Sequence, residues 1–499
     1  MWLLGLLFLW QGIGEEPAAR SEPAPVNVLF CIADDWGWPH AGVYGETAVR
    51  TPVFDRIARQ GVLFEHAYAA APSCTPSRNA IFTGRWHWRL RQGANLWSSL
   101  DAEIPTWTER LQQAGWFVGK TGKAWGPGKL ADGGRKGDPA GPRYPNLDAF
   151  LEAKPKGQPF CFWLGTSDPH RPFRKGAGRA AGIDPAAIRL PDFYPDDPVI
   201  REDLADYLFE VERFDRLVGQ ALRKLEETGE LNRTLVVMTS DHGMPFPRAK
   251  GNLYDAGSRV PLAMQWGERI PSKQRFTDVV SLVDLAPTIL AACGIPSLED
   301  CDGISFLEGI RFPDRNYQHR AFVLFGKERH TPCQEAPDLG GTPMRGIRTS
   351  RWLFIRNFRP DRWPAGTPNW QQAAWKQSWY GDCDNGPTKF FLIKYRNMPD
   401  VRPFYELAFA KRPAEELYDL NRDPEQIVNL AAKEEYRQVL AELRRKLEAE
   451  LIKTGDPRVT GDGVEIFEST PYYGGGVMRV DLTDWPEPNH RNRDKKDDK

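Results

Sequence analysis

The stretch Pro72-Ser73-Cys74-Thr75-Pro76-Ser77-Arg78-Asn79-Ala80-Ile81-Phe82-Thr83-Gly84-Arg85 holds the most informative pattern of this sequence. Cys74 stands four residues before Arg78, and Pro76 restricts the backbone between them. The segment ending in Thr83 and Gly84 predicts a short helix with the glycine as its C-terminal stop. Taken alone, the five-residue core is equally consistent with a buried structural cysteine beside a loop proline.

Outward from this stretch, three continuous apolar runs predict parallel strands buried on both faces. They cover residues 27–33, 159–166 and 234–239. Helical patterns between them would supply the crossover connections of an open α/β sheet, whose ligands bind beyond the carboxyl ends of the strands. Polar residues follow each run at that end: Asp34 and Asp35, Asp168 and His170, and Asp241 and His242.

Helices are expected at 51–60 and 104–114, and a long amphipathic helix at 204–225. Beyond about residue 312 we expect helix-free sequence to about 410, then a charged helix at 433–453. The charged last residues, 489–499, predict disorder. The expected organisation is a signal peptide and leader at 1–24, a catalytic domain at 25–311, a C-terminal subdomain at 312–455 and a tail at 456–499.

The composition sets broad limits. At 499 residues the chain exceeds one typical domain, and its formal net charge of -1 provides no general attraction to nucleic acid or membranes. We therefore expect no nucleic-acid partner and no stable membrane insertion. The apolar run at residues 1–10 is too short to span a bilayer and resembles a secretory signal peptide, although it lacks the usual positive charge. Export to the periplasm or the medium is the expectation.

The sequence has seven cysteines. Cys31 and Cys161 lie within apolar runs, which favours buried free thiols. Sequence alone cannot determine disulfide connectivity. The pairs to test are Cys293 with Cys301 and Cys333 with Cys383.

Asp34 and Asp35 form an adjacent carboxylate pair at a predicted strand end. Such a pair is costly through repulsion unless a cation neutralises it; an Asp-rich turn is the alternative. Asp241 and His242 belong to the same predicted sheet edge. An oxygen-rich ligand set favours a hard cation, so we expect Ca²⁺, with Mg²⁺ as the other candidate.

The Cys-x-Pro-x-Arg core followed by Thr-Gly-Arg resembles the signature of the type I sulfatases, in which that cysteine is oxidised to formylglycine. The resemblance is good over residues 26–310. At Asp168-Pro169-His170-Arg171 and at 241–247 it is closest to the sulfamidase-like (heparan N-sulfatase-like) members. It implies an α/β fold: an alkaline-phosphatase-like sandwich with a large mixed, mostly parallel sheet flanked by helices, and a smaller C-terminal α+β subdomain. It also implies a formylglycine-generating enzyme as the partner during maturation.

The resemblance implies a role for each matching residue. A hydrated aldehyde at position 74 would attack sulfur through one hydroxyl, and its second hydroxyl would later expel sulfate, so that the nucleophile regenerates itself. Arg78 would hold this group, Lys123 and Lys250 would bind sulfate oxygens, and His170 would protonate the leaving group. The implied metal ligands are Asp34, Asp35, Asp241 and His242, together with residue 74.

One position departs from the family. Sulfatases commonly have a histidine two residues after the lysine that Lys123 matches, and this chain has Trp125 there. The base for the elimination step is therefore unassigned. His66, His87 and His330 are the candidates.

The substrate expected from the resemblance is an acidic sulfated glycan. Six arginines between 345 and 362, interleaved with Trp352, Trp363 and Trp370, predict a basic and aromatic rim; a surface sheet with solvated charges is the alternative. The segment 327–330 is expected near the pocket mouth. His330 and Arg345 are the candidate substrate-binding residues.

Three functions follow for testing. The first is a sulfatase acting on O- or N-sulfate groups of a glycan. The second is a phosphoesterase or phosphonate hydrolase of the alkaline phosphatase superfamily, which the Cys-x-Pro-Ser-Arg context and the single-metal ligand count disfavour. The third is a catalytically silent protein that binds sulfated glycans, in whose favour Trp125 is the single feature.

Overall fold

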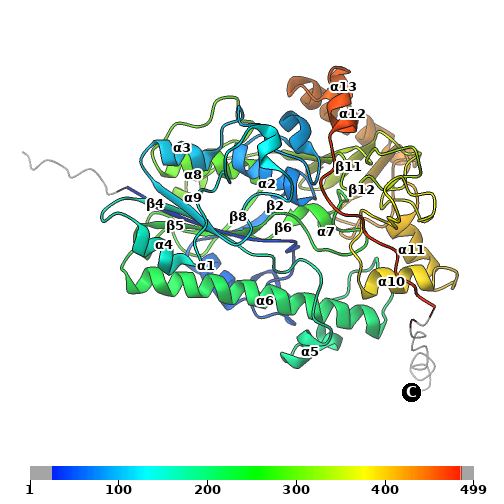
Figure 1. Ribbon diagram of the computed structural model, residues 1–499, viewed down its shortest axis with the longest axis horizontal. Coiled ribbons are helices and arrows are strands. Elements are labelled where there is room, and N and C mark those ends of the chain that lie inside the picture. The colour runs from blue at the N-terminus through cyan, green and yellow to red at the C-terminus, as the bar shows by residue number, and fades with distance from the viewer. Residues whose placement is uncertain (1–24, 484, 486–499) are drawn as a thin grey trace, which may run out of the picture.

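The structure is a computed structural model that describes residues 25–483 and 485. It contains one eight-stranded sheet and one four-stranded sheet (Figure 1). In the large sheet only β7 and β6 run against the other strands, so the sheet is mixed and mostly parallel, as predicted. Its order is β3 (Phe117–Thr121), β4 (Phe160–Gly165), β1 (Asn27–Ala33), β5 (Thr234–Ser240), β7 (Leu262–Gln265), β2 (Val62–Tyr68) and β6 (Arg259–Val260), with β8 (Gln274–Ser281) paired to β2.

Strand β1 explains why the predicted strands are continuous apolar runs. Leu29 and Cys31 face one hydrophobic core, whereas Phe30 and Ile32 face the other. Every residue of β1 is buried, because side chains alternate across a sheet that is covered on both faces. The three predicted strands are confirmed as β1, β4 and β5.

Helices cover both faces of this sheet (Figure 1). On one face lie α1 (Pro52–Gln60), α4 (Leu147–Ala153) and the long α6 (Pro198–Glu227). On the other lie α2 (Cys74–Thr83), α3 (Trp107–Gln113), α8 (Leu285–Ala292) and α9 (Leu307–Arg311). Two short helices, α5 (Ala177–Ala180) and α7 (Asp255–Ser258), stand in connections.

The helix ends follow local chemistry. Gly84 ends α2 in the left-handed conformation, with φ 66°, as the sequence predicts. Helix α3 begins at Trp107 and not at Ile104, because Thr106 caps it and forms a reciprocal capping box with Glu109.

The small sheet is antiparallel throughout and lies beside the large one. Leucines of α12 (Arg437–Lys453) pack on one of its faces, and Leu253 and Tyr254, just before α7, pack on the other. The chain thus builds a second, smaller α+β unit against the first. Its strands are ordered β12 (Glu415–Asp419), β11 (Trp352–Asn357), β10 (Met344–Thr349) and β9 (Phe322–Lys327).

The expectation of helix-free sequence from 312 to 410 is wrong. Helices α10 (Pro387–Lys394) and α11 (Arg402–Phe409) both lie in that range. Helix α10 escaped prediction because its consecutive residues 390–393 are all buried, so it shows no amphipathic pattern. The predicted charged helix is α12, which begins four residues later than expected.

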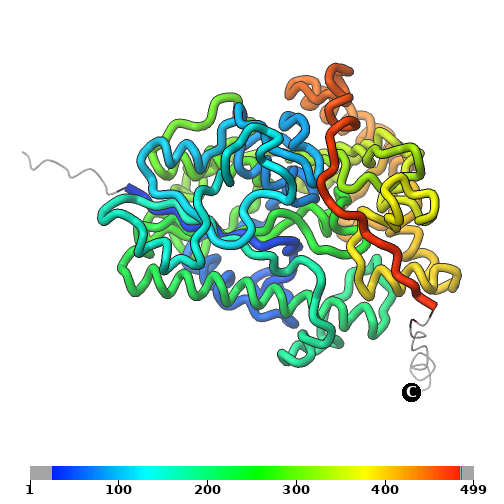
Figure 2. Tube along the Cα trace, in the orientation of Figure 1, coloured from blue at the N-terminus to red at the C-terminus, as the bar shows by residue number. Residues whose placement is uncertain are grey.

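Residues 456–483 are folded onto the rest of the chain. They include α13 (Pro457–Thr460) and α14 (Glu465–Ser469), and the Trp379 amide donates to the Val477 carbonyl. Figure 2 shows this last stretch in red running along the C-terminal region drawn in yellow. The predicted signal segment, 1–24, and the predicted disordered end, 489–499, lie outside the described residues.

All seven cysteines are described and all are free thiols, so neither candidate disulfide is formed. The Cys301 thiol donates to the Gly84 carbonyl, and the Cys333 thiol donates to the Asp382 carboxylate. Cys31 and Cys161 are buried thiols in β1 and β4, as predicted.

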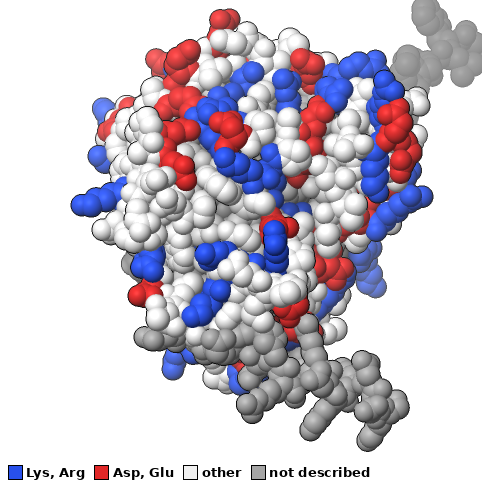
Figure 3. All heavy atoms as spheres, turned by 90° about the vertical axis from the view of Figure 1, so that its right-hand side faces the viewer, with Lys and Arg blue, Asp and Glu red and all other residues white. Residues whose placement is uncertain are grey.

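On the face shown in Figure 3, Lys and Arg side chains are interspersed with Asp and Glu side chains around a broad uncharged area. Across residues 25–483 and 485, no helix combines the length and the apolar character that a bilayer crossing requires.

Candidate active site

The predicted site residues meet at the carboxyl edge of the large sheet. Asp34 and Asp35 follow β1 directly, and Asp241 and His242 follow β5. The two strands pair in parallel register up to Ala33 with Ser240, so their polar extensions start side by side. The Asp34 amide also donates to the Asp168 carbonyl at 3.0 Å, which joins the end of β1 to the segment after β4.

Cys74 is the first residue of α2 and lies over these extensions. Its side chain is only 3% exposed, and its Sγ lies 3.4 Å from Nε2 of His242. Ser77, one turn later, donates to the Asp241 carbonyl at 2.5 Å and fixes the helix against β5. Burial raises the pKa of the Cys74 thiol, and the nearby Lys123 does not overcome that effect. An unmodified Cys74 is therefore a protonated thiol and a weak nucleophile.

The donor atoms around Cys74 fit a divalent cation. His242 donates from Nδ1 to the Gly243 carbonyl at 3.0 Å, because a carbonyl can only accept. In the singly protonated ring the lone pair is then on Nε2, which lies 3.1 Å from Oδ1 of Asp35, and that buried oxygen has no hydrogen-bond partner in the described part of the chain. A lone pair and a carboxylate oxygen repel each other at this distance unless a cation lies between them.

Two overlapping groups of ligand atoms lie at this point, each with its members within 4.8 Å of one another. Together they supply carboxylate oxygens and one imidazole nitrogen around residue 74, as the sequence predicts. The groups are Asp35, Cys74 and His242, and Asp34, Cys74 and Asp241.

Arg78 lies behind the ligand cluster and is fully buried. Its Nε donates to Asp241 at 2.9 Å and its Nη2 donates to Asp34 at 3.0 Å. Its remaining donors reach backbone carbonyls, including that of Ala124 at 2.9 Å. Arg78 therefore orients two carboxylates of the cluster, and no hydrogen bond joins it to Cys74 within residues 25–483 and 485.

Two lysines flank the cluster. Lys123 follows β3 and donates from Nζ to both oxygens of Asp34 at 2.7 Å. Lys250 donates to Oδ2 of Asp35 at 2.9 Å. Burial opposes the charge on both ammonium groups, but Asp34 and Asp35 raise the pKa of Lys123 and Lys250 above the usual value. The site therefore offers two fixed positive charges to an anionic group.

His170 lies at the mouth of the site. Its side chain is 32% exposed, and its Nε2 is 3.9 Å from Oδ2 of Asp35. Its Nδ1 donates to the Arg171 carbonyl at 2.5 Å, which leaves Nε2 free to exchange a proton with a bound molecule. This geometry suits a general acid or base.

The sequence did not reveal Asp384. Its Oδ2 accepts a hydrogen bond from Lys250 Nζ at 3.1 Å, and it groups with Asp35 and His170 within 4.8 Å. Although burial opposes ionisation, Lys250 and His170 hold the pKa of the Asp384 carboxyl below its usual range. The surrounding Asp-Cys-Asp-Asn-Gly sequence signals a turn and nothing more specific.

Of the three candidate bases, only His330 reaches the site. Its Nδ1 is hydrogen-bonded to Oγ of Ser73, next to Cys74, at 2.8 Å. Burial lowers the pKa of His330 to about 3, so the ring is neutral near pH 7. His66 instead contacts Arg259 on β6, and His87 is buried with both ring nitrogens unpaired among the described residues.

Trp125 faces α2. Its indole Nε1 donates to Oδ1 of Asn79 at 2.6 Å, so it fills space where the family commonly has an imidazole. It cannot serve as a base, because an indole N–H is a donor only.

Arg345 is not brought to the site. It is 0% exposed and its guanidinium binds Asp456 at 2.6 Å and Glu328 at 2.7 Å. Both partners lie in the C-terminal part of the chain, so Arg345 joins that part together. Its guanidinium N–H groups are occupied by these carboxylates and are not available to a substrate.

The predicted basic rim is replaced by paired charges, and because Arg345, Arg348 and Arg362 are buried, the alternative of a surface sheet with solvated charges does not describe the region either. Most of the six arginines of β10, β11 and the following loop bind carboxylates. Within the segment 327–330, Lys327 binds Asp382 and only His330 contacts a neighbour of Cys74. The paired arginines and their acids are Arg345 with Asp456, Arg348 with Asp255, Arg351 with Asp419, Arg359 with Asp361, and Arg362 with Asp338.

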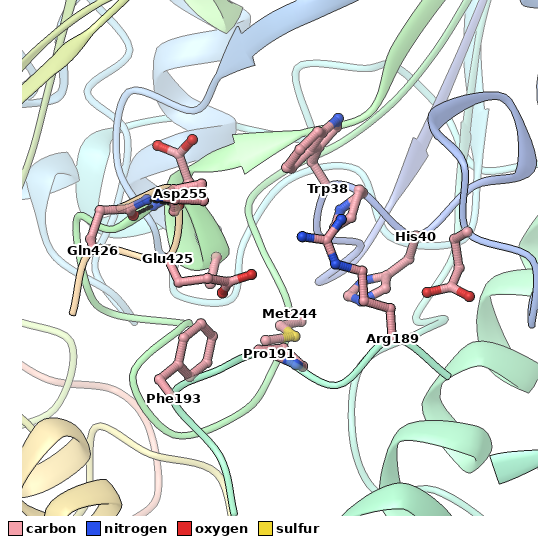
Figure 4. A pocket seen from close by; sticks show the side chains of 13 residues that line it. Trp38, His40, Arg189, Pro191, Phe193, Met244, Asp255, Glu425 and Gln426 are labelled. Carbon is pink, nitrogen blue, oxygen red and sulfur yellow. Dashed lines mark hydrogen bonds between the residues drawn. The ribbon is translucent and has the colours of Figure 1, made fainter. Parts of the chain in front are cut away.

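A separate cavity of about 90 Å³ is lined in part by Met244, which follows β5 in the chain (Figure 4). Figure 4 shows Arg189 on one side of it and Glu425 on the other. His40 and Trp38 line it, each with a buried ring nitrogen that has no hydrogen-bond partner in the described chain. None of the clustered lysines, carboxylates or cysteine lines this cavity, so it is distinct from the candidate active site.

Comparison with known families matches two regions of the chain. The family described as Sulfatase matches residues 26–127 and 142–295, which contain every residue of the cluster except Asp384. The family described as N-sulphoglucosamine sulphohydrolase, C-terminal, matches residues 246–364.

Individual relatives agree with this match. The human N-sulphoglucosamine sulphohydrolase is 29% identical over 489 residues, covering 88% of this chain and 93% of its own. An ulvan-active sulfatase of Formosa agariphila is 24% identical over 494 residues, covering 89% and 77%. A protein solved with its substrate D-glucosamine-2-N,6-O-disulfate superposes with a TM-score of 0.61 at 20% identity, covering 87% of this chain and 98% of its own.

Proposed function

Because the chain belongs to the sulfatase family, whose members are sulfuric ester hydrolases, we propose that it removes sulfate from a sulfated sugar, with Cys74 matured to formylglycine as the nucleophile. The observation that carries this proposal is the position of Cys74. Its Sγ belongs to a cluster of carboxylates and an imidazole whose Asp34 and Asp35 bind two lysine ammonium groups that can receive a sulfate. The burial of the thiol fits the proposal, because a buried protonated thiol needs conversion before it can act.

Each residue of the site has a separate role in the proposed reaction. Lys123 and Lys250 bind the sulfate oxygens and orient sulfur toward residue 74. With both ring nitrogens protonated, His170 can donate its Nε2 proton to the departing oxygen or nitrogen, since the Nδ1 proton is held by a carbonyl and the ring is partly exposed. Arg78 keeps Asp34 and Asp241 in place through its guanidinium.

A divalent cation would be held by Asp34, Asp35, Asp241 and His242. We propose Ca²⁺, with Mg²⁺ as the alternative, because oxygen ligands dominate the set. Such an ion supplies Lewis-acid polarisation of a sulfate oxygen when it is bound. The unpartnered Oδ1 of Asp35 supports an ion at this point.

The substrate class follows from the relatives. The human relative is named for N-sulfoglucosamine, and one structural relative was solved with a glucosamine disulfate. We propose a sulfated amino sugar or a glycan that ends in one, carrying N- or O-linked sulfate. Export and maturation by a formylglycine-generating enzyme are further parts of this proposal.

Mass spectrometry of the peptide that carries Cys74, from protein made in its own host, tests the nucleophile. Conversion of the CH₂–SH group to CHO, with sulfate release from D-glucosamine N-sulfate or D-glucosamine 6-sulfate, is the expected result. Active protein with an intact thiol would overturn the mechanism and favour a phosphoesterase or phosphonate hydrolase. Inactive protein with an intact thiol would favour a silent glycan-binding protein.

A further inference from the structure

Asp384 is hydrogen-bonded to Lys250 of the candidate active site and lies outside both family matches. It belongs to the segment 379–386, here called the Asp384 loop, which enters the site from outside the large sheet. Lys250 and Asp35 are 4% and 0% exposed in their side chains, whereas Asp384 is 21% exposed. Asp384 therefore lies above the deep lysine–carboxylate pair, at the level where a sugar attached to a bound sulfate would lie.

The Asp384 loop is held from below by Lys389 of α10. The buried Lys389 ammonium donates to the carbonyl oxygens of Trp379, Tyr380 and Cys383 at 3.0, 3.1 and 2.7 Å. It also donates to Oδ1 of Asn385 at 3.0 Å. A charged donor with four oxygen partners organises the backbone on either side of Asp384.

The loop is also joined to the residue next to the general acid. Arg171 makes a two-pronged ion pair with Asp203 of α6 at 2.7 and 2.8 Å. Oδ2 of Asp203 also accepts the amide and hydroxyl of Thr388, in the first turn of α10. This buried chain of contacts sets the loop against the segment of His170.

The hydrogen bonds of Asp384 leave one oxygen available. Oδ2 accepts from Lys250, and Oδ1 has no hydrogen-bond partner among the residues that the structure describes. A sulfate bound to Lys250 would lie close to Asp384, because Asp384 is hydrogen-bonded to the same ammonium group. A carboxylate in this position accepts a hydrogen bond from a hydroxyl or amine and repels a second anionic group.

On the basis of the proposed function, we propose that Asp384 is a specificity-determining residue whose carboxylate accepts a hydrogen bond from the sugar hydroxyl or amine nearest the sulfated position. The enzyme then selects sugars with a donor at that position and rejects those that lack it. The physical reason is that a bound sugar without the donor covers Oδ1 of Asp384 and leaves this oxygen without a hydrogen bond.

Matched deoxy sugars test this inference. The pairs are D-glucosamine N-sulfate with its 3-deoxy analogue and D-glucosamine 6-sulfate with its 4-deoxy analogue, and the readout is the ratio of kcat/KM within a pair. We expect the full-length matured protein to favour the hydroxylated member of the pair it hydrolyses by about 10- to 100-fold. In Asp384→Asn the ratio should fall, whatever happens to the overall rate, because a neutral amide oxygen is a weaker acceptor than a carboxylate, whereas Asp361→Asn, an exposed carboxylate paired with Arg359, should keep it.

A ratio near one in the unaltered protein, or a ratio unchanged in Asp384→Asn, would overturn the inference while leaving the sulfatase function intact. Release of sulfate from neither pair would instead contradict the proposed function. In that case calorimetry measures the affinity of the same sugar pairs for the Cys74→Ala chain, with and without Asp384→Asn, and so tests the inference without turnover. The same measurement applies if the single Asp384→Asn variant is too impaired to assay. Equal affinity for both members of each pair would overturn it.

Discussion

The strand-end site and the Asp384 loop meet at Lys250 but are built in different ways. Asp34, Asp35, Asp241 and His242 come from the ends of two adjacent parallel strands, where the sheet itself fixes their spacing. Asp384 comes from a loop fixed by Lys389 of α10 and, through Asp382, by Lys327 at the end of β9, so no strand of the large sheet carries it. The difference suggests that the sheet provides the chemistry and that the loop provides the choice of sugar.

The largest expected effect tests the strand-end side alone. Cys74→Ala removes the nucleophile and should lower kcat by about 10⁴-fold or more in a sulfate-release assay. Cys293→Ala, at the partly exposed end of α8, serves as the matched control and should retain turnover. Substantial turnover by Cys74→Ala would show that the sheet edge does not supply the nucleophile.

The next effect tests the residue that the two regions share. Lys250→Ala should lower kcat/KM by about 10²- to 10³-fold, because a fixed positive charge on the sulfate is lost and Asp35 and Asp384 lose their shared partner. Asp384→Asn should cost less overall and should change mainly the preference between sugars. Equal losses for all substrates in both variants would contradict the division between chemistry and choice.

A smaller effect is expected from the support of the loop. Lys389→Met leaves the carbonyl oxygens of the Asp384 loop without their donor and should lower the free energy of unfolding by about 1–3 kcal/mol. Denaturant unfolding measures this change, with Lys433→Met on an exposed position as the control. The same variant should reduce the preference for hydroxylated sugars, and a stable variant with unchanged preference would show that Lys389 does not position Asp384.

The last effect is confined to acid pH and concerns the contact between the C-terminal region and α2. Burial lowers the pKa of His330 from 6.5 to about 3, so between these pH values the unfolded chain binds the additional proton. The His330 contribution to the free energy of unfolding should therefore rise with pH from about 3 to 6.5 and be lost on acidification. Unfolding curves at several pH values should show a shallower dependence in His330→Gln; an unchanged slope would contradict this assignment.

A local sequence pattern predicts the buried strands of this chain but not the role of Arg345. The buried parallel strands are continuous apolar runs because both faces of the sheet are covered, and the polar residues that follow them necessarily meet at one edge. Arg345 looked like a candidate for substrate binding, yet it is fully buried between Asp456 and Glu328. The charge of an arginine is visible in a sequence, whereas its partner more than a hundred residues away is not.

By itself the sequence determined three adjacent strands of the large sheet, the polar residues at their ends and the Cys74 helix, because these depend on local periodicity and on a short motif. Only the tertiary structure decided that Asp384 joins Lys250 and His170, that Trp125 turns toward Asn79, and that most arginines of the expected rim are paired. Those outcomes depend on side chains from distant segments meeting in a low-dielectric interior, where each buried charge must find a partner. No local pattern in the chain encodes which partner that is.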